Sequence, residues 1–87
     1  MVEQKIMIKN PSGLHARPAH TFVSTAKQFK SCVNVEKGEK TANGKSIVSL
    51  LCADIGKNSE ILIRCDGEDE QEALKALLHL AENQFGE

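Results

Sequence analysis

The spacing of the apolar residues changes along the chain, and these changes restrict the fold more than any other feature of the sequence. Apolar residues at every second position are typical of a half-buried strand, whereas steps of three and four residues are typical of an amphipathic helix. The alternating residues form three groups: Val2, Ile6 and Ile8; Val33 and Val35; and Ile61, Ile63 and Cys65. These groups predict three strands that are separated along the chain.

Two longer segments show the helical spacing instead. The first, from Ala16 onward, has Ala19, Phe22, Val23, Ala26 and Phe29 on one face, and the last has Leu74, Leu77, Leu78, Ala81 and Phe85. Pro18 is compatible with the first helix because backbone donors in the first turn have no partner within the helix. Asp69, with Glu72 three residues later, predicts a capping box for the last helix, and Gly86 predicts its end.

The middle of the chain predicts a hairpin followed by a short helix. Lys37 and Gly38 supply turn residues after the strand that carries Val33 and Val35, and residues 40–43 form the returning strand. Ser46 is a favourable N-cap residue, so we expect a short helix in the apolar stretch "SIVSLLCA". The loop "DIGKNS" then leads into the strand "EILIRCD".

The resulting order is β-α-β-β-α-β-α in a single domain over residues 1–87. Each long helix has one apolar stripe and the strands alternate, so both patterns are satisfied by helices on one side of a mostly antiparallel sheet. We therefore expect an α+β fold, an open-faced β-sandwich with a four-stranded antiparallel sheet covered on one face by three helices.

Charge and composition set limits on function. Hydrophobic residues make up 40% of the chain, and the three aromatic residues are all Phe, so the core must be aliphatic. The net charge of −1 argues against a general nucleic-acid binder. The first 58 residues contain nine Lys/Arg and four Asp/Glu, whereas the remaining residues contain two and eight. A basic first part suits an acidic ligand or partner.

The cysteines and the N-terminal sequence predict the compartment. Cys32, Cys52 and Cys65 are odd in number and form no Cys-x-x-Cys pair, which favours a reduced intracellular protein. The sequence begins without the apolar core of a signal peptide, and no apolar run approaches the length of a membrane span. We expect a cytoplasmic protein without direct membrane insertion.

The stretch "NPSGLHARPA" carries the most chemistry. If His15 lies at the start of the first helix, its imidazole lies beside the backbone N–H groups of Ala16 and Arg17. These donors and the positive end of the helix dipole favour an anion, and the Arg17 guanidinium suits phosphate oxygens. Imidazole is also a nucleophile near neutral pH. The residues together predict a site that carries a phosphoryl group, without the machinery of a full enzyme.

The same residues have a simpler explanation. A lone His near a helix start is often a surface residue or an imperfect cap, so spacing alone leaves both interpretations open. A nucleotide-binding loop is poorly supported, because Gly13 stands without a G-x-x-x-x-G-K pattern.

"GLHARPA", followed about thirty residues later by "GKSI", resembles the HPr family, the histidine-containing phosphocarriers of the bacterial phosphoenolpyruvate-dependent sugar phosphotransferase system. The resemblance covers essentially the whole chain, including the acidic "GEDEQEAL" at the start of the last helix. It implies that His15 accepts a phosphoryl group on Nδ1 from phosphorylated enzyme I. The group then passes to the A domain of a sugar-specific enzyme II.

The resemblance also assigns roles around His15. It implies that Arg17 steadies the phosphoryl oxygens, that the N–H groups of Ala16 and Arg17 cap them, and that Ser12, Gly13 and Pro18 shape the loop. Ser46 has two compatible interpretations, a helix cap and a regulatory site. In Gram-positive relatives the serine at this motif is phosphorylated by a dedicated ATP-dependent kinase, which suggests an HPr serine kinase/phosphorylase and a catabolite-control regulator as further partners.

A partner surface is expected beside the active His. The residues that match the exposed apolar patch of the family, or that lie opposite the Phe stripe of the first helix, are His20, Ser24, Lys27, Lys45, Ile47, Val48 and Leu51. Leu50 and Leu51 have an alternative interpretation in which both belong to the core. The sequence departs from the family at Val48 and Leu51, where Met is common, and at Asp54, where Gly is common. These departures concern the choice of partners more than the role of His15.

Neither a metal nor a cofactor is expected. His20, His79 and the cysteines match no common ligand spacing, and Cys32 and Cys65 fall in strands as small apolar residues. A carrier that exposes one face to successive partners is expected to be a monomer. An alternative function is that of an HPr-like regulator acting mainly through phosphorylated Ser46, although such a protein has no need of His15.

Overall fold

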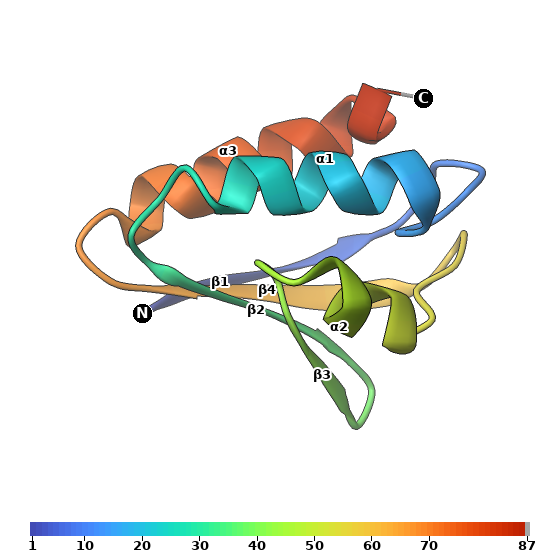
Figure 1. Ribbon diagram of the computed structural model, residues 1–87, viewed down its shortest axis with the longest axis horizontal. Helices are drawn as coiled ribbons and strands as arrows, with labels where there is room; N and C mark the ends of the chain where they lie inside the picture. Colours follow the sequence, from blue (N-terminus) through green and yellow to red (C-terminus); the bar gives the residue numbers. More distant parts are fainter. Residues whose placement is uncertain (87) are drawn as a thin grey trace.

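The computed structural model describes residues 1–86, in which four strands form one antiparallel sheet in the order β1-β4-β2-β3 (Figure 1). The strands are β1 (Val2–Met7), β2 (Cys32–Lys37), β3 (Lys40–Asn43) and β4 (Glu60–Asp66). β4 is the last strand in the chain, yet it lies inside the sheet and pairs with both β1 and β2. This arrangement places residues from both halves of the chain side by side.

Three helices cover one face of this sheet. They are α1 (Ala16–Ala26), α2 (Ile47–Cys52) and α3 (Glu70–Glu82), and a short 3₁₀ turn, η1 (Gln84–Gly86), follows α3. The two long helices, α1 and α3, lie side by side along the sheet, and α2 lies near β3 and the start of α1 (Figure 1). The predicted α+β open-faced sandwich and its element order are confirmed.

The strand register explains which face is buried. Ile61 lies opposite Ile6, while Ile63 lies opposite Val35, so the alternating residues of neighbouring strands share the helix-covered side. The largest buried side chains come from all the layers and include Phe22, Phe85, Ile8, Leu14, Leu50, Ile55, Ile61, Ile63 and Leu77. The aliphatic core expected from the composition is present. Within it, the ring centroids of Phe22 and Phe85 lie 6.4 Å apart.

Two details of the strands differ from the expectation. Lys37 pairs with Lys40, so the hairpin turn consists of Gly38 and Glu39 rather than of Lys37 and Gly38. The φ of +59° at Gly38 shows why glycine suits the first turn position. Cys32 is exposed rather than apolar core, because it lies opposite the exposed Asp66 on the uncovered face.

Both long helices end earlier than predicted. α1 ends at Ala26, and Phe29 follows it as a half-buried residue in the next turns. α3 ends at Glu82, not at Gly86, because Gln84 and Phe85 both have a φ of +53°. This reversal turns the Phe85 ring into the core, where it is 2% exposed.

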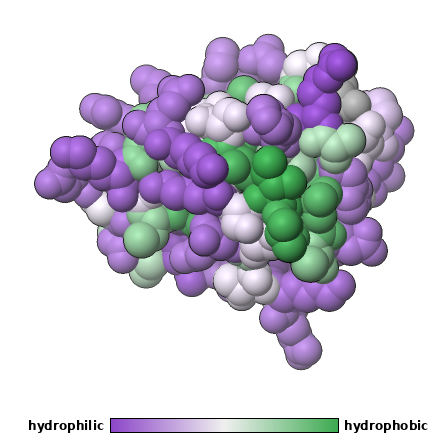
Figure 2. Space-filling view, viewed as in Figure 1, coloured by the Kyte–Doolittle hydropathy of each residue, from purple (hydrophilic) through white to green (hydrophobic). Residues whose placement is uncertain are grey.

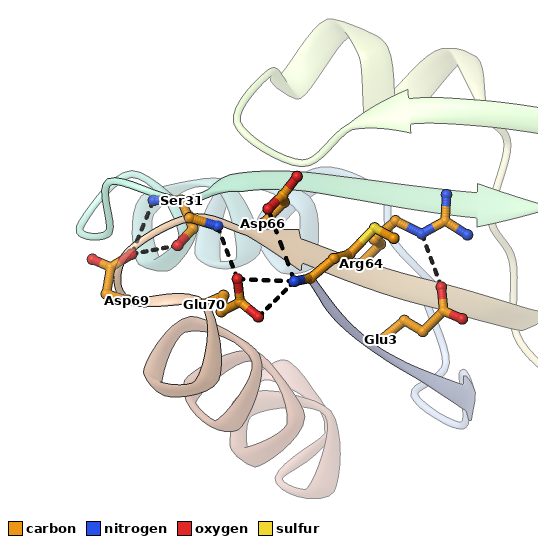
Figure 3. A network of polar contacts seen from close by, with 8 residues as sticks. Glu3, Ser31, Arg64, Asp66, Asp69 and Glu70 are labelled. Carbon is orange, nitrogen blue, oxygen red and sulfur yellow. Dashed lines mark hydrogen bonds and ion pairs between the residues drawn. The ribbon is translucent and has the colours of Figure 1, made fainter.

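The predicted capping box at the start of α3 is wrong. Asp69 occupies the N-cap position, but its carboxylate makes no capping bond to the helix. It accepts hydrogen bonds from the backbone N–H and the hydroxyl of Ser31 (Figure 3) and from the backbone N–H of Lys30, with both N–H bonds at 2.9 Å. At the start of α3 it is the carboxylate of Glu70 that accepts a local hydrogen bond, from the N–H of Gly67 at 3.2 Å. The loop before β2, rather than the start of α3, thus supplies the hydrogen-bond donors for the Asp69 carboxylate.

Candidate functional site

Two loops that are distant in sequence meet at the C-terminal side of β1. The N–H of Leu14 donates to the carbonyl of Ile55 at 2.8 Å, and the N–H of Asn58 donates to the carbonyl of Ile8 at 2.6 Å. The Asn10 side chain, which is fully buried, donates to the carbonyl of Gly13 at 2.7 Å. These bonds fix the path of the chain just before α1 begins.

Gly13 allows the two loops to approach each other. Its φ is +62°, and a Cβ at this position would lie 2.3 Å from the carbonyl oxygen of Ile55. Only glycine fits this contact without displacing the backbone. Pro18 is buried in the first turn of α1, and Ser12 lies exposed on the same loop.

His15 is the N-cap residue of α1. Its extended backbone (φ −124°, ψ 158°) leads into the helix, and its side chain makes no capping bond to the helix. The imidazole is 37% exposed, and its Nε2 lies 3.5 Å from a carboxylate oxygen of Asp54. The predicted position of His15 at the helix start is therefore confirmed, with a side chain that a partner is able to reach.

The backbone around His15 presents hydrogen-bond donors. Within residues 1–86, no acceptor is found for the N–H groups of Ala16 and Arg17, which belong to the first turn of α1. The Arg17 side chain is exposed, and no carboxylate of the described chain pairs with it. Ala16 has a φ of +51°, an unusual conformation for a residue with a Cβ. Donors and a cation thus lie next to an imidazole at one helix end.

The residues of the expected partner surface come from α1, from α2 and, in the case of Lys45, from the turn before α2, and the two helices are in contact. His20, Ser24 and Lys27 are exposed on α1. Figure 2 shows hydrophobic side chains gathered on the face where α2 lies, and these include Val48, which is 71% exposed, and Leu51, which is 41% exposed. The alternative in which both leucines belong to the core is wrong, because only Leu50 is buried.

The two remaining residues of this surface are Lys45 and Ile47, and Ser46, the expected regulatory site, lies between them. Ile47 is 37% exposed, whereas Lys45 is half-buried and its ammonium donates to the carbonyl of Phe29 at 2.7 Å. Ser46 is the N-cap of α2, and its hydroxyl accepts from the N–H of Ser49 at 3.2 Å. The predicted capping role of Ser46 is confirmed.

The contact between His15 and Asp54 was missed from the sequence. The chemical signal was present, because Asp54 places a carboxylate directly after a short helix, at a position where glycine is usual. Its proximity to His15 depends on the packing of two loops about forty residues apart, which no local pattern reveals. Lys37, at the end of β2, donates to the carbonyl of Asp54, a contact that also forms only in the folded chain.

No His, Cys, Asp and Glu side chains of residues 1–86 come together in a group of three that would hold a metal ion. No helix of the described chain has the length and apolar character needed to cross a membrane.

Comparison with known proteins agrees with this geometry. Residues 2–83 match the family model described as the PTS HPr component phosphorylation site. The chain belongs to the HPr family. The phosphocarrier protein HPr of Neisseria meningitidis is 46% identical over 87 residues, which cover 100% of this chain and 98% of that protein. The family resemblance inferred from "GLHARPA" and "GKSI" is confirmed.

Solved structures of HPr-like proteins share the fold. HPr-C-His from Thermoanaerobacter tengcongensis superposes with a TM-score of 0.98 at 46% identity, covering 100% of this chain and 98% of that one. Crh, the catabolite repression protein of Bacillus subtilis, superposes with a TM-score of 0.76 at 40% identity and 97% coverage of both chains. In that crystal structure Crh is a dimer with a swapped domain. Both phosphocarriers and a regulatory protein therefore share this architecture.

Proposed function

We propose that this protein is the phosphocarrier between enzyme I and the A domains of sugar-specific enzymes II. His15 accepts the phosphoryl group on Nδ1 from phosphorylated enzyme I, with phosphoenolpyruvate as the original donor. The observation that carries the proposal is the position of a partly exposed imidazole at the N-cap of α1, beside the N–H groups of Ala16 and Arg17.

The chemistry of transfer suits such an open site. The Nδ1 lone pair forms a P–N bond as the bond from phosphorus to the donor breaks, and the donor keeps that electron pair. The N–H groups of Ala16 and Arg17, the dipole of α1 and the Arg17 guanidinium would stabilise the phosphoryl oxygens. Because the group has to leave again, a shallow site that a second protein completes is more useful than a deep one.

The proposal is tested by the intact mass after incubation with phosphoenolpyruvate and purified enzyme I. We expect a gain of one phosphoryl group that acid treatment removes, as phosphohistidine requires. His15→Ala should abolish the gain. His79→Ala, which changes an exposed imidazole on α3 outside the expected partner surface, should retain it. Labelling of the His15→Ala variant at the rate of the unmodified protein would contradict the assignment.

Ser46 carries the second candidate function, that of a Crh-like regulator. The similarity to Crh and the position of Ser46 beside the exposed Val48 favour it. A phosphate at the start of α2 would add negative charge to the docking surface at a helix end that tolerates it. Incubation with ATP and an HPr serine kinase/phosphorylase would give an acid-stable product that Ser46→Ala lacks. Binding of that product to a catabolite-control regulator, with no transfer to His15, would favour the purely regulatory function.

We further propose a cytoplasmic monomer as the working form, because each partner must reach the same face. Dimeric relatives such as Crh make the oligomeric state a direct test. Light scattering at the concentration of the transfer assay should give the mass of one chain, and the mass of two chains would overturn this part.

A further inference from the structure

We propose that Asp54 is a positioning residue for His15, whose carboxylate keeps the imidazole proton on Nε2 and so leaves Nδ1 as the nucleophile. The inference deepens the proposed function, since it rests on His15 as the phosphoryl acceptor. It starts from the distance of 3.5 Å between Nε2 and the Asp54 carboxylate.

The backbone builds this contact into the fold. The N–H of Leu14 donates to the carbonyl of Ile55 at 2.8 Å, and the two residues flanking this bond are His15 on one segment of the chain and Asp54 on the other. The absence of a Cβ at Gly13 permits the close approach. From the hairpin side, the Lys37 ammonium donates to the Asp54 carbonyl and holds the loop in place. Two elements distant in sequence thus fix the backbone that carries the Asp54 side chain.

The backbone of Asp54 argues against a purely structural role. Asp54 follows Ala53, the C-cap of α2, and has a φ of +53°. A helix of this kind commonly ends with glycine in that conformation, because a Cβ is unfavourable there. A turn alone favours glycine, and Asp is one of the few other residues that adopt this conformation. We therefore attribute the carboxylate at this position to its proximity to the His15 imidazole.

The chemistry follows from the two ring nitrogens. A neutral imidazole has one N–H and one lone pair, and an ionised carboxylate only accepts hydrogen bonds. The tautomer with hydrogen on Nε2 directs its N–H dipole toward Asp54, whereas the other tautomer directs a lone pair toward a negative charge. The favoured tautomer has its lone pair on Nδ1, on the side of the ring where the phosphoryl group is expected.

Transfer then needs no movement of a proton. As the P–N bond to Nδ1 forms, Nε2 keeps its hydrogen and the ring becomes positively charged. The bond between phosphorus and the donor breaks, and its electron pair leaves with the donor. The Asp54 carboxylate faces the new positive charge and compensates it. Other charged residues of these segments are the exposed Arg17, the exposed Lys57 in the same loop as Asp54, and Lys37, whose ammonium donates to the Asp54 carbonyl.

The test measures the tautomers directly, by the ¹⁵N chemical shifts of the His15 ring at a pH well above the ordinary imidazole pKa. The unmodified protein, Asp54→Asn and Asp54→Gly are compared. Asparagine keeps the shape of the side chain and tolerates positive φ, while glycine removes all strain. Glu60→Gln, which neutralises an exposed carboxylate on β4, is the control variant. The ring of His20 is the internal control.

We expect the ratio of the Nε2–H to the Nδ1–H tautomer of His15 to fall by about two-fold or more in both Asp54 variants, the scale of an exposed charge interaction. Glu60→Gln and the His20 ring should show no change. An unchanged ratio in Asp54→Asn overturns the proposal, even if Asp54→Gly differs, because the carboxylate is then not responsible. The measurement uses no phosphoryl donor, so its failure is distinguishable from a failure of the carrier function.

Discussion

Residues with a positive φ gather around His15. Gly13, Ala16 and Asp54 have φ values of +62°, +51° and +53°, and they lie in the two loops that form the site or at the start of α1. Conformations of this kind persist only where the surrounding structure fixes them, at about 1–3 kcal/mol for a residue that has a Cβ. The hydrogen bond from Leu14 to Ile55 and the buried Asn10 supply that surrounding structure.

The approach of the two loops predicts a large effect of a small substitution at Gly13. Gly13→Ala combines an unfavourable φ with a Cβ only 2.3 Å from a backbone carbonyl. We expect the free energy of unfolding to fall by more than about 2 kcal/mol, measured by urea denaturation. Gly38→Ala is the matched control, because its φ is +59° but no atom lies within 4 Å of the new Cβ. A loss of about 1 kcal/mol is expected there. Equal losses for both variants would show that the loop contact contributes nothing.

For single residues, the sequence predicted which side chains carry the chemistry of the site, but it did not predict which residues from distant segments contact them. His15 was correctly placed at a helix start because Pro18 and the turn residues before it limit where α1 begins. The reason for glycine at position 13 lies in Ile55, which enters the site only when the sheet is assembled. The partnership of His15 with Asp54 depends on that assembly in the same way.

The two faces of α2 have different roles. Leu50 is fully buried, whereas Val48, two residues earlier, is 71% exposed. We expect Leu50→Ala to lower the free energy of unfolding by about 2–5 kcal/mol. Val48→Ala should change it by less than about 0.5 kcal/mol, yet raise the KM for phosphorylation by enzyme I several-fold, because an apolar contact with the partner is lost. An unchanged KM for Val48→Ala would remove Val48 from the docking surface.

The junction between α1, β2 and α3 predicts sensitivity to acid. Hydrogen bonds from the Ser31 hydroxyl (Figure 3), and from the N–H groups of Lys30 and Ser31, lower the pKa of Asp69 from 3.8 to about 2. A folded-state pKa below the unfolded one means that the ionised carboxylate stabilises the fold above about pH 4. That contribution is lost as the pH falls toward about 2.

Urea midpoints measured between about pH 5 and about pH 2 check this expectation. Asp69→Asn should lower the midpoint at the upper end of the range and flatten its dependence on pH. Glu68→Gln, at an exposed neighbouring carboxylate, should leave the slope unchanged. Some slope should remain in Asp69→Asn, because the N-terminal ammonium and the N–H of Gly67 also lower the pKa of Glu70. Parallel curves for Asp69→Asn and the unmodified protein would contradict the role of Asp69.

Elements were predicted better than their ends. The alternation of Ile61, Ile63 and Cys65 was sufficient to define β4. When only one face of a strand is buried, an alternating pattern is compatible with only one choice of the residues that face the core. The end of α3 was missed because the burial of Phe85 decides it, through a backbone reversal at Gln84 and Phe85. The cap of α3 was missed because the Asp69 carboxylate binds donors of Lys30 and Ser31, which are distant in sequence and which no local pattern reveals.

At the scale of the whole molecule, the reactivity of the three thiols measures how often the sheet opens. Cys32 and Cys52 are exposed, whereas Cys65 is buried between β1 and β2. Burial, with smaller contributions from Glu70 and Asp69, raises the pKa of the Cys65 thiol to about 11. We expect a maleimide to label two thiols rapidly in the folded protein.

Labelling of Cys65 then requires the sheet to open. Its rate should be about 10³-fold slower or more, and it should rise with urea in parallel with global unfolding. A variant with Cys32→Ser and Cys52→Ser isolates this thiol for the measurement by intact mass. Rapid labelling of Cys65 in the absence of urea would show that β4 opens locally.

The position of β4 in the sheet has a consequence for the order of events on the ribosome. β1 and β2 do not pair with each other, and the strand that joins them spans residues 60–66. The carbonyl of Ile55, which anchors the loop before His15, also emerges late. A nascent chain that has released only its first half therefore carries His15, the proposed phosphoryl acceptor, without the loop that positions it. We expect His15 to become competent only when synthesis has passed β4.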